Sequence, residues 1–264
     1  MSFTSMGRTL DWEFVGVENF RKLFAGTDPI VPRILENTVI YVAGALPVTI
    51  GVGLLVSLLS MRMAKTAGLF FRTVFFIPRV VPPVVWGFLW AWSWEGTRYG
   101  VFNQVLEAFG ISPVYWLTRY SMLIVVMANG FLGVSLAMLI FTSAIAGIPV
   151  DYTRAAEVDG ASYWQLSRHI IVPMLRWPIA VMTMWHLMSF INSYVYILLI
   201  TGGGPYYSTS VWSLYGYTSA FKEYLYGYGS SLMMILVIVN AILFFLAWRI
   251  FGVKRLIAPT RLEA

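Results

Sequence analysis

The sequence predicts an all-α polytopic membrane protein, and three observations lead to that prediction. Of the 264 residues, 59% are hydrophobic and only 11% are charged, and the mean hydropathy is +0.74. A soluble domain of this length carries far fewer apolar residues. The apolar residues also form runs long enough to cross the hydrocarbon core of a bilayer, and basic residues gather beside the ends of those runs.

Five apolar runs predict five membrane-spanning helices. In chain order, the runs cover residues 37–61, 73–94, 122–146, 178–200 and 230–250. The second run contains Pro78, Pro82 and Pro83, so we expect its helix to be kinked, because proline removes a backbone donor. Around the runs we expect an external N-terminal segment (1–36), a single membrane domain (37–251) and a cytoplasmic tail (252–264).

The basic residues predict which side of the membrane each loop occupies. If the loop 148–178 is cytoplasmic, that side carries most of the basic loop residues: Arg62, Lys65, Arg72, Arg154, Arg168, Arg176, Lys254, Arg255 and Arg261. The opposite side carries Arg98, Arg119 and Lys222, each with an acidic residue nearby. The net charge of +6 therefore indicates membrane topology rather than nucleic-acid binding. The N-terminal segment is the exception, because it places Arg8, Arg21, Lys22 and Arg33 outside.

Several kinds of catalytic or metal site are excluded by composition. The chain has no Cys, which excludes disulfides, thiolate catalysis and Cys-based metal sites, and its two His leave little for a His-based metal site. No nucleotide-binding loop is present, since Gly202–Gly204 is followed by Pro205 and lacks the required Lys. We therefore expect no metal and no cofactor on this chain.

The loop 148–178 is polar yet predicts ordered structure. Asp151 is a predicted N-cap for a helix over residues 152–158, and Gly160 follows the end of that helix, where a left-handed residue stops it. Ser162 is a predicted N-cap for a second helix, with Gln165 completing a capping box. Pro173 and Pro178 should bend or end this second helix. We call residues 151–164 the elbow; its small and charged residues are typical of a docking surface.

The elbow resembles the EAA loop of binding-protein-dependent ABC importer permeases, in the form found in the carbohydrate-uptake branch. The matching residues are Arg154, Ala155, Ala156, Glu157, Asp159, Gly160 and Ala161, followed by Ile170 and Pro173. The resemblance implies that this coupling loop inserts into a groove on a cytoplasmic ATPase subunit. Arg154 stands where the family usually has Glu; as the third helical residue, a Glu would complete a capping box with Asp151.

Two further segments resemble the same family: Thr201–Pro205 is similar to its T-x-G-G-P turn, and Gly100–Asn103 to its G-x-x-N loop. The resemblance implies six spans with the first missing here, so the chain either starts at an internal Met or is a five-span version. It also implies two ATPase subunits that bind ATP and Mg²⁺, a second permease subunit, an external solute-binding protein, and residence in a bacterial or archaeal cell membrane.

Polar residues inside the predicted spans are candidates for a substrate path, because each must face protein or a water-filled path. Amides and hydroxyls beside aromatic rings suit a sugar. The candidates are Asn129, Asn192, Tyr194 and Asn240, with Ser135, Ser193 and Tyr196 nearby in the same runs. The alternative for each is a helix–helix contact. Arg79 either snorkels to the inner face or pairs with a partner chain.

These inferences combine into one functional expectation. The chain is expected to be a permease subunit of an ATP-driven importer for a sugar or sugar-like solute, and not an enzyme. The alternatives are a stand-alone secondary transporter or channel, and a permease for a non-sugar solute. An intramembrane enzyme is disfavoured, because the predicted spans offer only Arg79 and His186 as ionisable partners.

Overall fold

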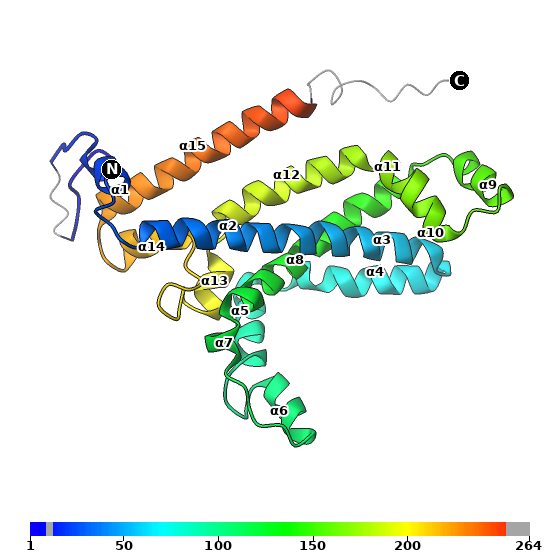
Figure 1. Cartoon of the computed structure of the whole chain (residues 1–264), viewed down its shortest axis with the longest axis horizontal. Helices are drawn as coiled ribbons and strands as arrows, with labels where there is room; N and C mark the ends of the chain where they lie inside the picture. Colours follow the sequence, from blue (N-terminus) through cyan, green and yellow to red (C-terminus); the bar gives the residue numbers. More distant parts are fainter. Residues whose placement is uncertain (9–12, 252–264) are drawn as a thin grey trace. The chain divides into compact units, whose positions relative to one another are not determined.

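The computed structural model describes residues 1–8 and 13–251, and it is all-α: over those ranges it contains no strand, only an isolated bridge between Thr4 and Phe14. The predicted tail 252–264, with its basic residues, lies outside the described residues. By contacts the chain divides into two compact units, one formed by residues 1–31 with the chain from 215 onward, the other by residues 32–214 (Figure 1). Each unit is described by itself.

The first apolar run forms one long helix, Val31–Arg62, that begins six residues before the predicted start. It consists of α2 (Val31–Pro47), a π-helical stretch η1 (Val48–Val52) and α3 (Gly53–Arg62). The helix tolerates Pro32 because backbone N–H groups in the first turn make no hydrogen bond within the helix, so the N–H that proline lacks is not missed. Pro47 lies inside it, and the wider π-helical turn follows at once, as expected where a backbone donor is missing.

The second run was predicted as a helix kinked by its prolines; the bend is confirmed, but the helix is broken there and not merely kinked. The chain forms α4 (Lys65–Val80) and α5 (Pro83–Ser93), which meet at 101°. The cause is the Pro82-Pro83 pair: a residue before proline is forced out of the helical region, and Val81 and Pro82 are both extended, with ψ of 130° and 140°. The pair is either one broken span or a re-entrant loop.

The third run forms α8 (Ser121–Ala146), which starts one residue before the predicted run and ends with it. It is the central helix of the second unit and contacts α3, α4 and α12 (Arg176–Asn192). Before it, α6 (Val101–Ala108) and α7 (Trp116–Arg119) extend from the end of α5 (Figure 1).

Between α8 and α12 the chain forms the short helices of the coupling loop. They are α9 (Val150–Val158), α10 (Tyr163–Leu166), the π-helical η2 (Ser167–Ile171) and α11 (Val172–Met174). The fourth run was predicted as continuous over 178–200, but it is broken after α12 and resumes as α13 (Val195–Ile200). After α13, α14 (Trp212–Phe221) leads to α15.

The first unit joins the N-terminal segment to α15 (Tyr226–Phe251), which contains the fifth apolar run. Helix α1 (Glu18–Phe24) packs on α15, and Asp28 accepts hydrogen bonds from the hydroxyls of Tyr215 and Tyr228. Burial alone would raise the pKa of the Asp28 carboxyl, but these hydrogen bonds and the backbone N–H of Ile30 outweigh burial and hold the pKa below its ordinary value.

The helices of the described residues are consistent with three to five membrane crossings. Val31–Arg62, Ser121–Ala146 and Tyr226–Arg249 are each long and apolar enough to span a bilayer, and the count rises to five if each of two bent helix pairs is one span. The second bent pair joins residues 163–174 to α12 at 67°.

Candidate functional site

The first helix of the elbow, α9, is not capped as the sequence predicted. It begins at Val150 directly after Pro149, and no side chain caps it. Asp151 therefore lies inside the first turn, where its charge still suits the helix dipole. Arg154 is consequently the fifth helical residue rather than the third. The prediction that a Glu at this position would complete a capping box with Asp151 is therefore wrong.

The end of α9 agrees with the prediction at Gly160. This glycine has φ of +77°, the left-handed conformation that ends a helix. The backbone N–H of Ala161 donates to the Ala156 carbonyl at 2.9 Å, and that of Gly160 donates to the Glu157 carbonyl at 3.0 Å. This pair of bonds is the Schellman motif, which satisfies the last carbonyls and sets the direction in which the chain leaves the helix.

The second helix of the elbow has the predicted capping box. The Ser162 backbone N–H donates to Gln165 Oε1 at 2.8 Å, and the Gln165 N–H donates to Ser162 Oγ at 3.4 Å. The helical segment then runs on through η2 and α11, and the 67° bend falls at Leu175, between Pro173 and Pro178. The two prolines thus flank the bend instead of marking separate helix ends.

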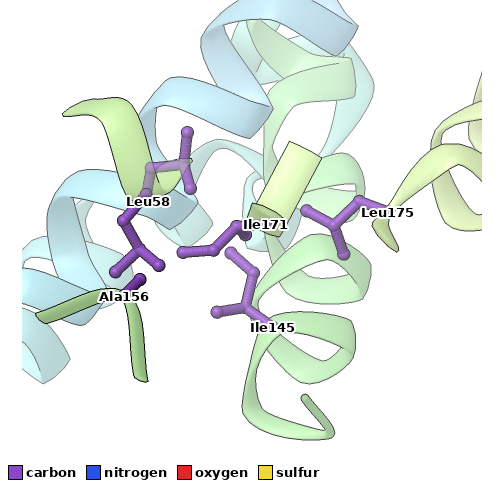
Figure 2. Packing of buried hydrophobic residues seen from close by; sticks show 6 residues of the cluster. Leu58, Ile145, Ala156, Ile171 and Leu175 are labelled. Carbon is purple, nitrogen blue, oxygen red and sulfur yellow. The ribbon is translucent and has the colours of Figure 1, made fainter. Parts of the chain in front are cut away.

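One face of the elbow is held by a buried apolar cluster (Figure 2). Its buried members are Leu58, Ile145, Ala156, Leu166, Ile171 and Leu175. Ala156 is 8% exposed, and in Figure 2 its side chain lies beside Leu58, with Ile171 and Ile145 completing the contact. The Tyr163 hydroxyl also donates to the Leu58 carbonyl, and the Arg62 guanidinium lies 5.2 Å from the Tyr163 ring centroid. The elbow is therefore held to α3 by Tyr163 of α10, and Ala156 of α9 is buried in the same cluster as Leu58 of α3 and Ile145 of α8.

The opposite face of the elbow carries unpaired charges. Arg154, Ala155, Glu157 and Asp159 are exposed, and within residues 1–8 and 13–251 the single ion pair lies elsewhere, between Arg21 and Glu18. Two shallow hollows of about 390 and 340 Å³ border Asp159 and Ile170, one reaching Ala155 and the other reaching Gly160. The elbow thus offers a small apolar side chain, charges and hollows on a helix whose other face is fixed.

Among the predicted path residues, Asn129 is a helix–helix contact. It is 4% exposed, and its amide nitrogen donates to the Tyr41 hydroxyl and to Ser193 Oγ, the latter at 2.8 Å. We call Tyr41, Asn129 and Ser193 the Asn129 cluster; it joins α2, α8 and the break between α12 and α13. Ser135 has a similar structural role, because its hydroxyl donates to the Phe75 carbonyl at 2.8 Å.

The other candidates lie in two different units. Asn192 is exposed at the end of α12, where its amide donates to the Met188 carbonyl at 2.7 Å. Tyr194 is half-buried in the break that follows. Asn240 lies on α15 in the first unit and donates to the Leu236 carbonyl at 2.7 Å. The structure therefore brings Asn129 next to the break that contains Tyr194, and Asn192 is exposed at the end of the helix that precedes this break.

Sequence reasoning missed several residues that hold the spans together. Tyr41 is fully buried in α2, and a hydroxyl in an apolar run was itself a signal, because a buried Tyr needs a partner. Gly130 and Gly133 allow the first long helix to approach α8: an added Cβ would lie 2.9 Å from Val48 Cγ1 and 2.5 Å from Thr49 Oγ1, respectively. Small residues at such spacing are typical of helix contacts in membranes.

The structural role of Asn103 was also not predicted, because in the sequence this residue appears only as part of a segment that resembles a family loop. Its fully buried side chain donates to the carbonyls of Glu95, Thr97 and Val114, and it accepts from Trp116 Nε1 at 2.8 Å. One amide thus fixes the connection between α5 and α8.

Comparison with known proteins places this architecture in a family. The model of the binding-protein-dependent transport system inner membrane component matches residues 49–253. A probable ABC transporter permease of Bacillus subtilis, YurN, is 31% identical over 90% of this chain and 82% of its own length. A diacetylchitobiose uptake permease of Streptomyces coelicolor is 27% identical over 93% of this chain and 74% of its own length.

A solved structure shares the fold. A chain of a bacterial alginate ABC transporter, in complex with an alginate-bound periplasmic protein, superposes with a TM-score of 0.82 at 22% identity, covering 91% of this chain and 84% of its own. With the family match extending over most of the described helices, the chain belongs to the binding-protein-dependent transport system inner membrane components, the permease subunits of ABC importers.

Proposed function

We propose that this permease forms half of the translocation path for a sugar or sugar-like solute and couples to a cytoplasmic ATPase through the elbow, residues 151–164. The observation that carries the proposal is the two-sided construction of α9. Ala156 holds one face of the helix to the membrane helices, whereas Arg154, Ala155 and Glu157 on the other face are exposed.

This construction suits the transmission of movement between two proteins. Ala155 is small, so a partner's backbone can approach closely, and the unpaired charges of Arg154, Glu157 and Asp159 can pair with it. Because Arg154 is a cation where the family usually has Glu, we expect an acidic residue on the ATPase to face it. Because Ala156 is buried in one cluster with Leu58 of α3 and Ile145 of α8, displacement of α9 by the ATPase would displace those helices as well.

The proposed cycle is alternating access driven by ATP on the separate ATPase chains. Two ATPase subunits close and move the elbow of this permease and of a second, homologous permease. The cavity then opens outward, where a solute-binding protein delivers substrate; the turn 202–205 is proposed to lie on that side, and so is the segment 217–221, which forms the end of α14 rather than the loop expected from the sequence. The positive-inside pattern supports a cytoplasmic elbow, with the chain residing in a bacterial or archaeal cell membrane.

A sugar as solute is supported by the relatives and by the residues at the helix break. The relatives include uptake permeases for diacetylchitobiose and galactooligosaccharides. Asn192 is the last residue of α12 and Tyr194 lies in the break before α13, and interrupted helices expose backbone polar groups at transport sites. Asn240 on α15 stays a proposed path residue, and Asn129 is proposed to position the break through Ser193. A non-sugar solute is the second candidate, because another relative takes up osmoprotective compounds.

Co-purification of the ATPase subunit tests the coupling proposal. Ala155→Arg changes an exposed residue of the elbow, and Ala108→Arg is the matched control, because Ala108 is exposed at the end of α6 in a predicted external loop. We expect Ala155→Arg to reduce the retained ATPase at least tenfold, equivalent to about 1.4 kcal/mol of binding, while Ala108→Arg retains it fully. Equal retention by both variants would refute the elbow as the docking site. Solute uptake without any ATPase would instead favour a secondary transporter or channel.

A further inference from the structure

A hollow that the coupling function does not use lies between the end of α3, α4 and the second half of α8. Its volume is about 540 Å³. Most of its lining is apolar, including Leu69, Phe76, Met138 and Leu139, but Arg72 and Thr142 also line it. No acidic residue contributes to the lining. A cation beside an apolar wall is costly unless an anion accompanies it.

Arg72 is held in place but not neutralised. Its Nε donates to the Gly68 carbonyl at 3.1 Å, one helical turn back along α4, and the side chain is half-buried. Within the described ranges Arg72 makes no ion pair. The guanidinium nitrogens Nη1 and Nη2 retain donors, and a guanidinium is the group best suited to bind phosphate oxygens.

Thr142 supplies a second polar group whose hydroxyl has no partner. The residue is 7% exposed, and its Oγ1 is buried without a hydrogen bond in the described part of the chain. A helical Thr usually donates to the carbonyl four residues earlier. Here that carbonyl, on Met138, already accepts the Ser57 hydroxyl at 3.0 Å as well as the helix's own N–H. Thr142 lines the hollow, so its hydroxyl is an unused donor at that wall.

The residues that line the hollow lie at different depths. Arg72 is about 10 Å along the axis from Lys65, the first residue of α4, and Thr142 is about 6 Å from the end of α8. Phe76 and Met138 lie one further turn from those helix ends, whereas Leu69 and Ala146 lie nearer to the ends, so the lining is apolar on both sides of Arg72 and Thr142. A cation with a long apolar wall on its deeper side suits a phospholipid, whose phosphate can lie on Arg72 while its acyl chain extends along Phe76 and Met138.

We propose that this hollow binds one anionic phospholipid, with its phosphate on Arg72 and an acyl chain along Phe76, Met138 and Leu139. The assignment to the inner leaflet rests on the proposed cytoplasmic elbow. Arg62 is the last residue of α3 and Lys65 is the first residue of α4, and both add to the attraction for an anionic headgroup. A lipid in this position would bridge α4 to α8, the helix that also carries Ile145 of the cluster under the elbow.

Native mass spectrometry of the full chain, purified with its co-purifying subunits, tests the proposal. The probes are phosphatidylglycerol, phosphatidylethanolamine with the same acyl chains, and inorganic phosphate. We expect preferential retention of phosphatidylglycerol, and weakening of it by about fivefold in Arg72→Gln, the size typical of one basic group at an anionic membrane surface. Arg79→Gln is the matched control, because Arg79 is exposed on the same helix outside the hollow, and should change nothing.

Three outcomes would overturn the lipid site. The first is equal retention of the two lipids by the native chain, and the second is equal behaviour of the two Arg variants. The third is displacement of phosphatidylglycerol by inorganic phosphate, which would indicate a free-anion site. Filling the groove with Leu139→Trp should also reduce lipid retention, with the thermal unfolding temperature checked to show that the fold is intact.

Occupation by a protein chain is tested separately. Because the chain has no Cys, Leu139→Cys introduces its sole thiol. The proposal expects no cross-link from this thiol to another polypeptide in membranes, and an efficient cross-link would overturn it in favour of a protein interface. Neither experiment depends on ATPase binding, so the failure of the lipid site and the failure of coupling are distinguishable.

Discussion

The Asn129 cluster and the outer face of the elbow use polar side chains in opposite ways. In the cluster, the Asn129 amide binds the hydroxyls of Tyr41 and Ser193, so that the polar groups satisfy one another away from water. On the elbow, Arg154 and Glu157 are exposed and make no ion pair within the described residues. The comparison separates polar residues that hold the fold from polar residues that are available to a partner.

The same comparison holds between two adjacent alanines, and this gives the largest expected effect. Ala156→Arg would place an unpaired charge in the cluster beneath α9, which we expect to cost about 3 kcal/mol or more of unfolding free energy. Ala155→Arg should stay within about 0.5 kcal/mol, because Ala155 is exposed. Thermal unfolding in detergent measures both. Equal destabilisation would show that α9 has no separate inner and outer face.

Two asparagines, one in the Asn129 cluster and one at the exposed end of α12, test the cluster next. Asn129→Leu leaves the Tyr41 and Ser193 hydroxyls without their shared partner, so we expect a loss of about 2 kcal/mol of unfolding free energy. Asn192→Leu changes an exposed side chain and should lower solute uptake more than stability. The reverse order, with Asn192 the more destabilising change, would contradict the structural role assigned to Asn129.

Asp28 adds a smaller, pH-dependent effect in the first unit. Its folded-state pKa is below the ordinary value of 3.8, so its stabilising contribution is complete above the ordinary pKa and is lost as pH falls through the folded-state pKa. Asp28→Asn should cost about 1 kcal/mol of unfolding free energy at pH 7, because the hydrogen bonds from Tyr215 and Tyr228 lose their charge. It should also flatten the acid limb of stability measured by thermal unfolding. An unchanged acid limb would show that Asp28 does not contribute.

Much of the fold could be predicted because it depends on local chemistry. The boundaries of α8 follow from hydropathy, and the Gly160 turn and the Ser162–Gln165 capping box follow from backbone conformation and hydrogen bonding within a few residues. Hydropathy does not report chain direction, so the break at Ser193–Tyr194 was missed, and the bend at Val81–Pro82 was predicted from its prolines but only as a kink. The Pro82-Pro83 pair did contain a signal for the first break, because each proline restricts the residue before it.

The candidate site divides in the same way. The elbow's residues were found from a local pattern, but the pattern did not show that Ala156 faces inward while Ala155 faces outward, since that depends on packing against α3 and α8. The role of Asn129 depends on two hydroxyls 88 and 64 residues away in the chain. Contacts between residues so far apart are not readable from one sequence.

The central claim, that the outer face of the elbow docks on an ATPase, is tested most directly by site-specific cross-linking in membranes. The absence of Cys makes Ala155→Cys and Ala108→Cys single-thiol variants. We predict that Ala155→Cys cross-links to the ATPase subunit and that Ala108→Cys does not. If Ala155→Cys gives no ATPase cross-link in membranes that support ATP-dependent uptake, the elbow is not the coupling site.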